Sequence, residues 1–367
     1  MSLSESEYKA AAFEKRLAHL ITCGAYTKAN LGFPVQPNRG ITHYVRGFLK
    51  RFIEEHDQRK KIYRTETKYL SLKHQVMISK GHKSQNWTAE RLAQLHFFES
   101  YEHPLEIIDR QGVVLGYRFR LPPHLITALE ESEAILPVIK ATKQTRGSYL
   151  VRHYAHWADF SDKVFESSDY QKQKEAADRW LEANKPLFQH LSNFLRIYNP
   201  EMWVGMTKSS FNASDGHLLG LARPWHGIAI GQGMGSEGGK DHQDWQDRMS
   251  VFNAVVPFGA TGWKGAEVVL WQLGIKVAVE RGDCFMFKGA IIAHKACAIT
   301  EGQRNFIDLF CHKSVYDVQN RVKEEAGQAK STDIRKRAPS KPNLDTGKKS
   351  NSKEIAQEAG VKKEGED

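Results

Sequence analysis

Hydrophobic residues recur along the chain with two periods, one typical of helices and one typical of strands. In residues 45–53, and again in residues 162–198, apolar side chains return every three or four positions, which predicts amphipathic helices. Asn199-Pro200 ends the second segment. We expect this segment to pack on a sheet through one apolar stripe. The stripe consists of Leu187, Phe188, Leu191, Phe194 and Leu195.

Strand-like runs begin near residue 105. The stretch LEIIDRQGVVLGYRF, which starts at Leu105, contains two β-rich runs around Arg110-Gln111-Gly112 and predicts a hairpin. Between residues 224 and 312, short β-branched or aromatic runs alternate with glycine-rich turns, which favours an antiparallel sandwich or barrel. These runs are WHGIAI, MSVFNAVVPF, AEVVLW, IKVAV, CFMF, AIIAH and RNFIDLFCH.

The pattern divides the chain into three parts of an α+β protein. Residues 1–100 predict a basic, mostly helical extension, and residues 101–316 predict a strand-rich domain whose motifs lie at 225–312. Residues 317–367 form a tail of mainly Lys, Glu, Ser and Pro. A segment with so few large apolar side chains cannot build a core, so we expect the tail to be disordered.

Composition is typical of a globular protein that stays inside the cell. A hydrophobic content of 40% with 10% aromatic residues is enough for a packed core. No stretch approaches the roughly 18 consecutive apolar residues of a membrane helix. The polar opening MSLSESEYKAAAFEKRL also lacks the apolar region of a signal peptide. Without a C-x-x-C pair, the four cysteines are expected to be reduced thiols. They are Cys23, Cys284, Cys297 and Cys311.

The net charge of +10 is concentrated in two segments. Residues 37–83 hold 12 basic and 4 acidic side chains, residues 321–367 hold 12 and 9, and the remainder is almost neutral. In the first segment Lys60, Lys61 and Arg64 alternate with tyrosines, as expected of a surface that follows a phosphate backbone. A solvated protein face is the alternative.

A short basic cluster in the tail indicates where the protein acts. Arg335-Lys336-Arg337 is similar to a nuclear-localisation signal, so we expect a nuclear protein, with some of it in the cytoplasm. A merely soluble charged tail is the alternative.

The sequence His242-Gln243-Asp244 carries the candidate chemistry. Alternate residues of an extended segment share a face, so His242 and Asp244 can bind one metal ion while Gln243 points away. His294, at the end of the run AIIAH, can supply a third ligand from a distant strand. Two imidazoles and one carboxylate form the facial triad of non-haem Fe(II) oxygenases. The alternative is a pair of surface-loop residues and a buried core histidine.

Arg304 follows His294 by ten residues and opens the last strand-like run. A guanidinium directed into an apolar interior needs an anionic partner, because an unpaired buried charge is costly. A dicarboxylate co-substrate supplies such a partner, since guanidinium binds carboxylate in bidentate fashion.

These motifs resemble the Fe(II)/2-oxoglutarate-dependent dioxygenases, whose double-stranded β-helix (jelly-roll) carries H-x-D, a distal His and a later Arg. More narrowly, KDHQDWQD, the stretch from VVPFGATGWKG to GAIIAH, and GQRNFIDLFCH are similar to the fungal branch of the TET/JBP family of nucleic-acid base oxygenases. The resemblance covers about residues 105–315. It implies a jelly-roll core flanked by helices, with Fe(II) bound by His242, Asp244 and His294 and 2-oxoglutarate bound by Arg304.

Two positions depart from the family pattern. The usual Gly-Gly before a core strand reads Gly265-Ala266, and the R-x-S pattern reads Arg304-Asn305-Phe306. The second departure removes a usual hydrogen-bond donor to 2-oxoglutarate.

Further candidates surround these motifs. The resemblance makes Asp247 a partner of a ligand imidazole, and a solvated loop carboxylate is the alternative. Strand alternation puts Asp308 on the face of Arg304, where it can accept a hydrogen bond from a cytosine amino group or pair with a basic side chain. Other side chains can line a base pocket or pack in the core. They are Arg223, His226, Trp245, Trp263 and Trp271.

A rival metal set consists of His153, His156 and Asp159. It lacks a distal Arg, and we expect it to be a polar helix or loop.

The resemblance implies an oxygenase that uses O2 and 2-oxoglutarate, releases succinate and carbon dioxide, and hydroxylates a methylated base in DNA. The favoured base is 5-methylcytosine, with thymine and N6-methyladenine as further candidates. RNA, a protein side chain or a small molecule are alternative substrates for the same chemistry. A non-catalytic nucleic-acid-binding protein is the alternative from another class. The sequence gives no oligomeric state.

Overall fold

The computed structural model describes residues 51, 59–73, 88–99, 102–138, 149–158, 164–208, 222–233, 238–259 and 262–317. Several sequence predictions lie outside these residues: the helix at 45–53 apart from Arg51, Cys23, Asp159, the tail beyond residue 317 and its basic cluster.

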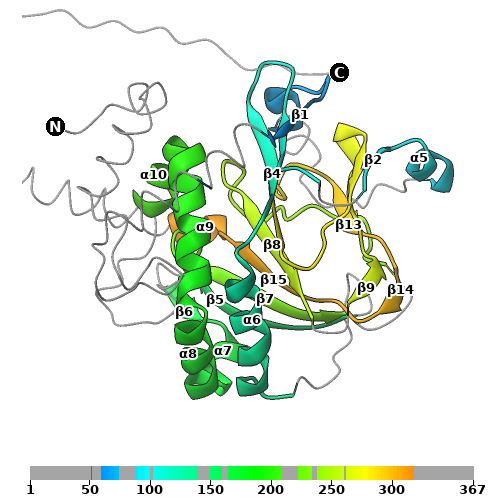
Figure 1. Cartoon of the computed structure of the whole chain (residues 1–367). Helices are drawn as coiled ribbons and strands as arrows, with labels where there is room; N and C mark the ends of the chain where they lie inside the picture. The colour runs from blue at the N-terminus through cyan, green and yellow to red at the C-terminus, as the bar shows by residue number, and fades with distance from the viewer. Residues whose placement is uncertain are drawn as a thin grey trace, which may run out of the picture. The chain divides into compact units, whose positions relative to one another are not determined.

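A nine-stranded mixed sheet forms the centre of the described fold (Figure 1). Its central strands pair antiparallel, whereas the edge strand β1 pairs parallel with β3. In spatial order the strands are β1 (Lys61–Arg64), β3 (Leu105–Ile108), β4 (Val114–Arg120), β12 (Asp283–Phe287), β8 (Asn253–Phe258), β15 (Asn305–Phe310), β7 (Gly227–Gly233), β5 (Tyr149–Ala158) and β6 (Val164–Glu166).

A four-stranded sheet packs against one half of the large sheet. Phe285 and Phe287 of the large sheet share a buried cluster with Val268, Leu270 and Val277 of the small one. The small sheet has the order β13 (His294–Ala296), β10 (Val268–Leu270), β11 (Ile275–Val277), β2 (His96–Phe98). A separate ribbon pairs β9 (Trp263–Gly265) with β14 (Ile299–Gly302).

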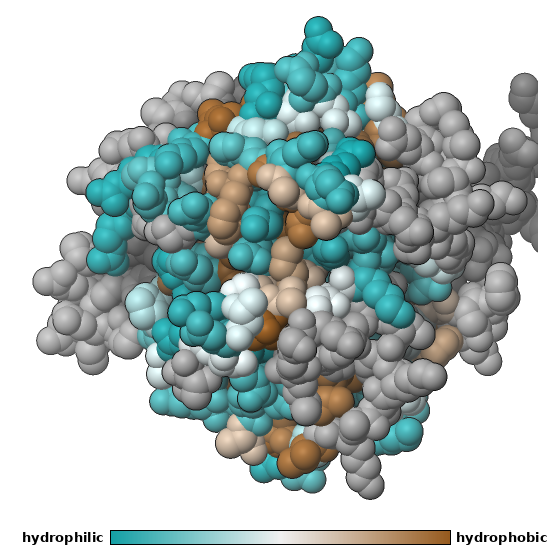
Figure 2. All heavy atoms as spheres, turned by 90° about the vertical axis from the view of Figure 1, so that its right-hand side faces the viewer, coloured by the Kyte–Doolittle hydropathy of each residue, from teal (hydrophilic) through white to brown (hydrophobic). Residues whose placement is uncertain are grey.

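The outer face of the small sheet is mixed, with lysines alternating with apolar residues across the strands. In its register Lys276 and Lys295 flank Val269, which is covered by Leu92 and Leu95 around the short helix α5 (Ala89–Ala93). Figure 2 shows this side of the molecule, where hydrophilic side chains surround narrow strips of hydrophobic ones. The outer surface of β10 is therefore covered by residues around α5 and flanked by the side chains of Lys276 and Lys295.

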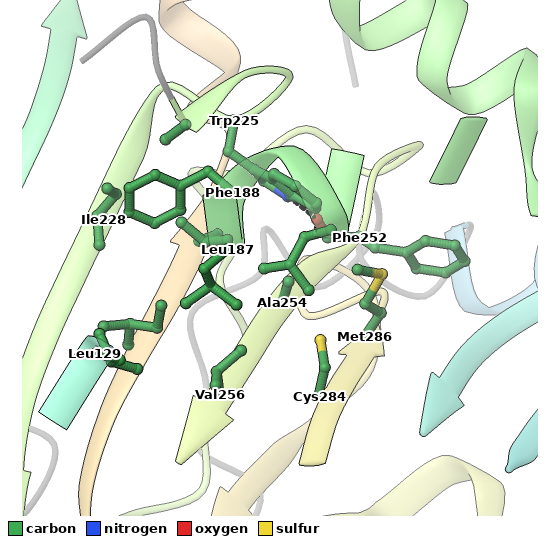
Figure 3. Close-up of a cluster of buried hydrophobic side chains, with 14 of the residues drawn as sticks. Leu129, Leu187, Phe188, Trp225, Ile228, Phe252, Ala254, Val256, Cys284 and Met286 are labelled. Atoms are coloured by element: carbon green, nitrogen blue, oxygen red, sulfur yellow. Dashed lines mark hydrogen bonds between the residues drawn. The ribbon is translucent and has the colours of Figure 1, made fainter. Parts of the chain in front are cut away.

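Helices cover the opposite face of the large sheet. The predicted stripe of α9 is buried there with residues of β7, β8 and β15, because its apolar positions recur with the helical period (Figure 3). The stripe prediction is confirmed. The covering helices are α6 (Pro123–Ser132), α7 (Ser168–Lys172), α8 (Lys174–Ala183), α9 (Lys185–Tyr198) and α10 (Pro200–Lys208). The described residues also include two 3₁₀ turns, η2 (Glu133–Ile135) and η5 (Trp271–Leu273), and short helical stretches at 69–73 and 313–317.

The predicted hairpin is confirmed, and the chemistry of its turn is visible. Asp109 is fully buried and its Oδ1 accepts hydrogen bonds from the backbone N–H groups of Gln111 and Val113, both at 2.7 Å. Gly112 has φ +87°, a conformation that glycine adopts without strain. The Asp109 carboxylate thus supplies hydrogen-bond acceptors for the backbone N–H groups of the turn that joins β3 to β4.

Two expectations about chain organisation differ from the structure. Residues 162–198 are not helical throughout, because the strand β6 precedes α7, and Pro200 starts the further helix α10. Before residue 100, β1 pairs with β3 and β2 pairs with β11, both in parallel. These strands have three or four residues, too few for a period to be recognised in the sequence. The described part of the predicted extension therefore contributes one strand to each of the two sheets.

Alternation along β7 and β15 separates two faces of the large sheet. Ile228, Ile230, Ile307 and Leu309 lie in the cluster beneath the helices. The intervening residues therefore point to the other side, which we call the inner face. They are Gly227, Ala229 and Gly231 on β7 and Phe306, Asp308 and Phe310 on β15.

The α+β class predicted from the sequence is confirmed by these sheets and helices. Among the described residues, no helix combines the length and apolarity that crossing a membrane requires. The three cysteines in this part of the chain, Cys284, Cys297 and Cys311, are free thiols, as expected.

Candidate metal centre

The structure brings His242, Asp244 and His294 together. One ligand atom from each lies within 4.8 Å of the other two. The Nε2 atom of His294 is 3.4 Å from Oδ2 of Asp244, and that of His242 is 3.9 Å from Oδ1. Two imidazole nitrogens and a carboxylate at this spacing match the donor set that suits a non-haem iron ion.

Backbone hydrogen bonds hold the two imidazoles side by side. The N–H of His242 donates to the carbonyl of His294 at 3.0 Å, and the N–H of His294 donates back at 2.9 Å. The ring centroids are 4.3 Å apart. The two ligands, far apart in the sequence, are therefore fixed by one antiparallel bridge.

The protonation of both rings is set by neighbouring carbonyls. Nδ1 of His242 lies 2.7 Å from the carbonyl oxygen of Lys240, and Nδ1 of His294 lies 2.8 Å from that of Ile292. A carbonyl only accepts, so each Nδ1 is the donor in these contacts, and Nε2 is the ring nitrogen that faces the Asp244 carboxylate. Such outer contacts are usual for metal-binding histidines.

The H-x-D segment is not a strand, which corrects one premise of the sequence prediction. His242 forms an isolated bridge, and Asp244 lies at the start of a turn, where its N–H donates to the carbonyl of Gly289 at 3.0 Å. Gln243 still points away, since its Nε2 donates to the Ile291 carbonyl at 3.0 Å. An extended backbone gave the expected alternation without belonging to a sheet.

Asn253 links the ligand carboxylate to a second carboxylate. Its side-chain amide donates to Oδ2 of Asp247 at 2.9 Å and to Oδ2 of Asp244 at 3.4 Å. An amide NH2 has two hydrogens, so it can serve both acceptors at once. Asp247 thus contacts Asp244 through Asn253 and also directly, since its N–H donates to the Asp244 carbonyl at 2.7 Å. The expected contact with a ligand imidazole stays a prediction. Asn253 was not foreseen because asparagine in a strand carries no sequence signal.

Gly289 lets the backbone approach Asp244 closely. A Cβ atom at residue 289 would lie 2.6 Å from Oδ2 of Asp244 and 3.0 Å from Oδ1 of Asn253. Gly289 has an ordinary backbone conformation, so the space and not the φ angle requires glycine.

Gly289→Ala is therefore expected to displace the Asp244 carboxylate and to lower metal affinity roughly 10- to 100-fold, as for loss of an outer-shell partner. Titration with Mn(II) or Fe(II) under nitrogen measures the effect. Gly205→Ala is the matched control, because no atom lies within 4 Å of a Cβ there. Equal metal affinity in both variants would contradict this account of Gly289.

Arg304 is buried with an exposed fraction of 5%. Its Nε and Nη2 atoms have no hydrogen-bond partner among the described residues. Burial lowers the pKa of the guanidinium to about 10, so it stays charged at neutral pH. A buried guanidinium with two nitrogens that lack hydrogen bonds is costly, which makes Arg304 a candidate site for an anion.

Arg304 belongs to the same face of the large sheet as the metal cluster. By alternation it shares the inner face with Phe306 and Asp308. Asn253, which bonds Asp244, and Phe287, whose ring centroid is 4.8 Å from that of His294, lie on this face as well. Arg304 precedes β15 instead of opening it.

An aromatic group lies on the inner face beside the metal cluster. It consists of His153, Trp157, Phe310 and His312, with the Trp157 ring 5.7 Å from Phe310 and 5.0 Å from His312. The ring of His312 contacts Oε1 of Gln246 at 2.8 Å, and its backbone bridges to Asp247. Burial, with Lys313 nearby, lowers the pKa of His312 to about 4, so this ring is neutral.

Two further predicted pocket residues, His226 and Arg223, precede β7 in the chain. His226 lies 4% exposed on the helix side, where its Nε2 accepts the N–H of His312 at 2.9 Å, and burial lowers its pKa to about 3. Arg223 is half-buried, and burial lowers its pKa. The adjacent Trp225 is in the core (Figure 3). His226 therefore lies on the side of the sheet opposite the inner face, so the structure does not bring it to the metal cluster.

The three candidate tryptophans have different surroundings. Trp271 is 1% exposed and donates to Oδ1 of Asp241 at 2.6 Å, so it packs in the core. Trp263 is half-buried on β9. Trp245 is half-buried next to Asp244, with Nζ of Lys313 5.2 Å from its ring. Only Trp245 adjoins a metal ligand in the chain.

The basic residues in β1 and directly before it have partners within the protein. Lys60 pairs with Glu106 at 2.6 Å and Lys61 with Glu102 at 3.3 Å. Arg64 donates to the carbonyl of Arg110 at 3.3 Å. Lys61 and Arg64 remain exposed, so contact with a phosphate backbone stays a prediction.

The two histidines of the rival metal set lie in neither a helix nor a loop, and Asp159 is outside the described residues. His153 and His156 lie on β5, three residues apart, and therefore point to opposite faces of the sheet. His156 is buried on the helix side, while His153 joins the aromatic group.

No protein-family model matches the sequence, and no curated protein does either. Similar solved structures include NgTET1 in complex with 5mC DNA, at 17% identity, covering 68% of this chain and 93% of that one, with a TM-score of 0.48. OsALKBH1 has 13% identity, coverage of 54% and 96%, and a TM-score of 0.32. An oxidoreductase of the 2OG-Fe(II) oxygenase family from Burkholderia pseudomallei has 12% identity, coverage of 62% and 91%, and a TM-score of 0.31. With TM-scores below 0.5, the chemistry of the site rests on its own geometry. The chain is thus similar to solved 2-oxoglutarate and Fe(II) oxygenases, the resemblance that its sequence indicates.

Proposed function

We propose that this protein is an Fe(II)- and 2-oxoglutarate-dependent dioxygenase, and that its two packed sheets are a double-stranded β-helix. The observation that carries the proposal is the pairing of two features on one face of the large sheet. One is a cluster of two imidazoles and a carboxylate, in which both Nε2 atoms lie beside the carboxylate oxygens. The other is a buried guanidinium with partnerless nitrogens. A metal alone would leave Arg304 unexplained.

Each residue has a defined task in this proposal. His242, Asp244 and His294 would hold Fe(II), which supplies the activation of O2. Asn253 keeps the Asp244 carboxylate oriented, and Arg304 would bind the distal carboxylate of 2-oxoglutarate. The residues thus fit both the metal and the co-substrate. In the balanced reaction one oxygen atom enters succinate, the other enters a hydroxymethyl group, and carbon dioxide leaves.

We propose a methylated base in DNA as the substrate, with 5-methylcytosine first and thymine or N6-methyladenine next. The aromatic group beside the metal cluster supports this choice, because a base taken out of the helix stacks on such rings. Asp308, on the same face, supplies an acceptor for an exocyclic amino group. The basic segment at 37–83, which includes Lys60, Lys61 and Arg64, is suited to binding a phosphate backbone.

The test is incubation with Fe(II), 2-oxoglutarate and duplex DNA that contains 5-methylcytosine, followed by mass spectrometry of nucleosides and succinate. We expect 5-hydroxymethylcytosine and DNA-dependent succinate in equal amounts. Duplexes with N6-methyladenine, unmethylated duplexes, and methylated RNA are the comparison substrates. Succinate release without any oxidised base would reject the DNA substrate and retain the chemistry. Absence of succinate with every substrate would reject the oxygenase itself.

A further inference from the structure

Two phenylalanine rings of β15 lie directly over glycines of the neighbouring strand β7. Phe306 is opposite Gly231 and Phe310 is opposite Gly227. A Cβ atom on Gly231 would lie 2.2 Å from Cε1 of Phe306, and one on Gly227 would lie 2.3 Å from Cε2 of Phe310. Neither glycine has a positive φ, so the rings and not the backbone require glycine at both positions.

The first ring borders the buried guanidinium. Cζ of Arg304 is 5.5 Å from the centroid of the Phe306 ring, within the range of a cation–π contact. On its other side Phe306 is opposite Pro257, which has no N–H to offer. Arg304 is therefore flanked by an aromatic wall at the position where the R-x-S pattern has a hydroxyl.

We infer that Phe306 is a positioning residue for Arg304, held over Gly231 so that its ring orients the guanidinium and keeps water from the bound carboxylate. This inference rests on the proposed function, since it concerns the 2-oxoglutarate that Arg304 would bind.

The physical gain comes from the surroundings of the ion pair. An apolar wall lowers the local dielectric response, which strengthens attraction between the guanidinium and a carboxylate. A planar guanidinium fixed against a ring also loses less freedom when it forms two hydrogen bonds. The chain thereby replaces a hydroxyl donor with a better-ordered cation. The departure from the R-x-S pattern is then an alternative solution to the same binding task.

Gly231→Ala tests the inference without removing any polar group. The new methyl group must push the Phe306 ring from its place. We expect the affinity of the Mn(II)-loaded protein for 2-oxoglutarate, measured by calorimetry, to fall roughly 3- to 30-fold, the range of a desolvated cation–π contact. Mn(II) affinity should stay unchanged. Phe306→Leu, which leaves Gly231 unobstructed, should weaken 2-oxoglutarate binding similarly, whereas Phe306→Tyr should retain it.

Gly227→Ala is the matched control, because it makes the same change beneath Phe310 on the same pair of strands. It should leave 2-oxoglutarate affinity at the wild-type value. A Gly231→Ala, Phe306→Leu double variant should bind no worse than Phe306→Leu alone, since the methyl group then has no ring to displace. Thermal unfolding confirms that each variant is folded.

The outcomes separate this inference from the proposed function. If wild-type protein does not bind 2-oxoglutarate, the proposed function fails, and this inference fails with it. If the wild type binds but Phe306→Leu binds equally well, only the positioning role of Phe306 is overturned. Equal losses in Gly231→Ala and Gly227→Ala would also overturn it, because the effect would then be a general disturbance of β7.

Discussion

Asp244→Ala is expected to abolish metal binding and 2-oxoglutarate turnover. The Asp244 carboxylate is the only carboxylate in the cluster of described residues that could hold the metal, and two imidazoles remain without it. Loss of an outer-shell partner alone costs roughly 10- to 100-fold in affinity, and loss of the ligand itself should exceed that. Calorimetric titration with Mn(II), together with succinate measurement under Fe(II), detects both effects.

Asp241→Asn is the matched control for this change. It removes a neighbouring carboxylate charge but keeps the Oδ1 acceptor that Trp271 uses at 2.6 Å. Metal affinity of the control should stay within about tenfold of wild type, less than the loss of an outer-shell partner can cause. Wild-type metal affinity in Asp244→Ala would mean that the three residues are not the metal site.

Arg304→Met is expected to act in opposite directions on stability and on ligand binding. The wild-type protein carries a buried guanidinium whose Nε and Nη2 lack partners in the described part of the chain. Replacing a poorly compensated buried charge with an apolar side chain of similar length stabilises proteins by about 1–4 kcal/mol. The unfolding temperature of the ligand-free variant should therefore rise by a few degrees, roughly 2–4 °C per kcal/mol.

The same substitution should remove the response to 2-oxoglutarate. Loss of one partner from a buried charge pair costs about 2–5 kcal/mol, which is roughly a 30- to 5000-fold drop in affinity. Saturating 2-oxoglutarate should raise the unfolding temperature of the Mn(II)-loaded wild type, because a ligand stabilises the state that binds it. Differential scanning fluorimetry with and without 2-oxoglutarate compares the two proteins. A variant that is less stable and still responds would contradict the role assigned to Arg304.

The sequence predicted which three residues cluster better than it predicted the contacts that orient them. His242, Asp244, His294 and Arg304 were recognisable because metal and anion chemistry restricts residue type and spacing. The stripe of α9 followed from its period. Asn253 was not recognisable, because its role depends on which residues of β8 and the H-x-D segment come together in the folded chain.

Strand register explains most of what the sequence did not reveal. Gly231 beneath Phe306, and Gly289 against Asp244, depend on cross-strand or loop contacts that no local pattern encodes. Register also decides which face of the sheet each side chain occupies, since a shift by one residue moves every side chain of a strand to the other face. His226 was assigned to the pocket although it lies on the helix side of the sheet, and His153 was set aside although it belongs to the aromatic group.

The paired backbone hydrogen bonds between His242 and His294 have a consequence for metal exchange. These bonds join the two ligand segments through the main chain and involve no metal. Proteins whose metal site forms only on binding unfold when the metal is taken away. Here backbone hydrogen bonds hold the two imidazoles together, so we expect loss of a bound metal ion to leave the fold in place. The supply of iron, and not a refolding step, would then limit the rate at which metal-free protein regains activity.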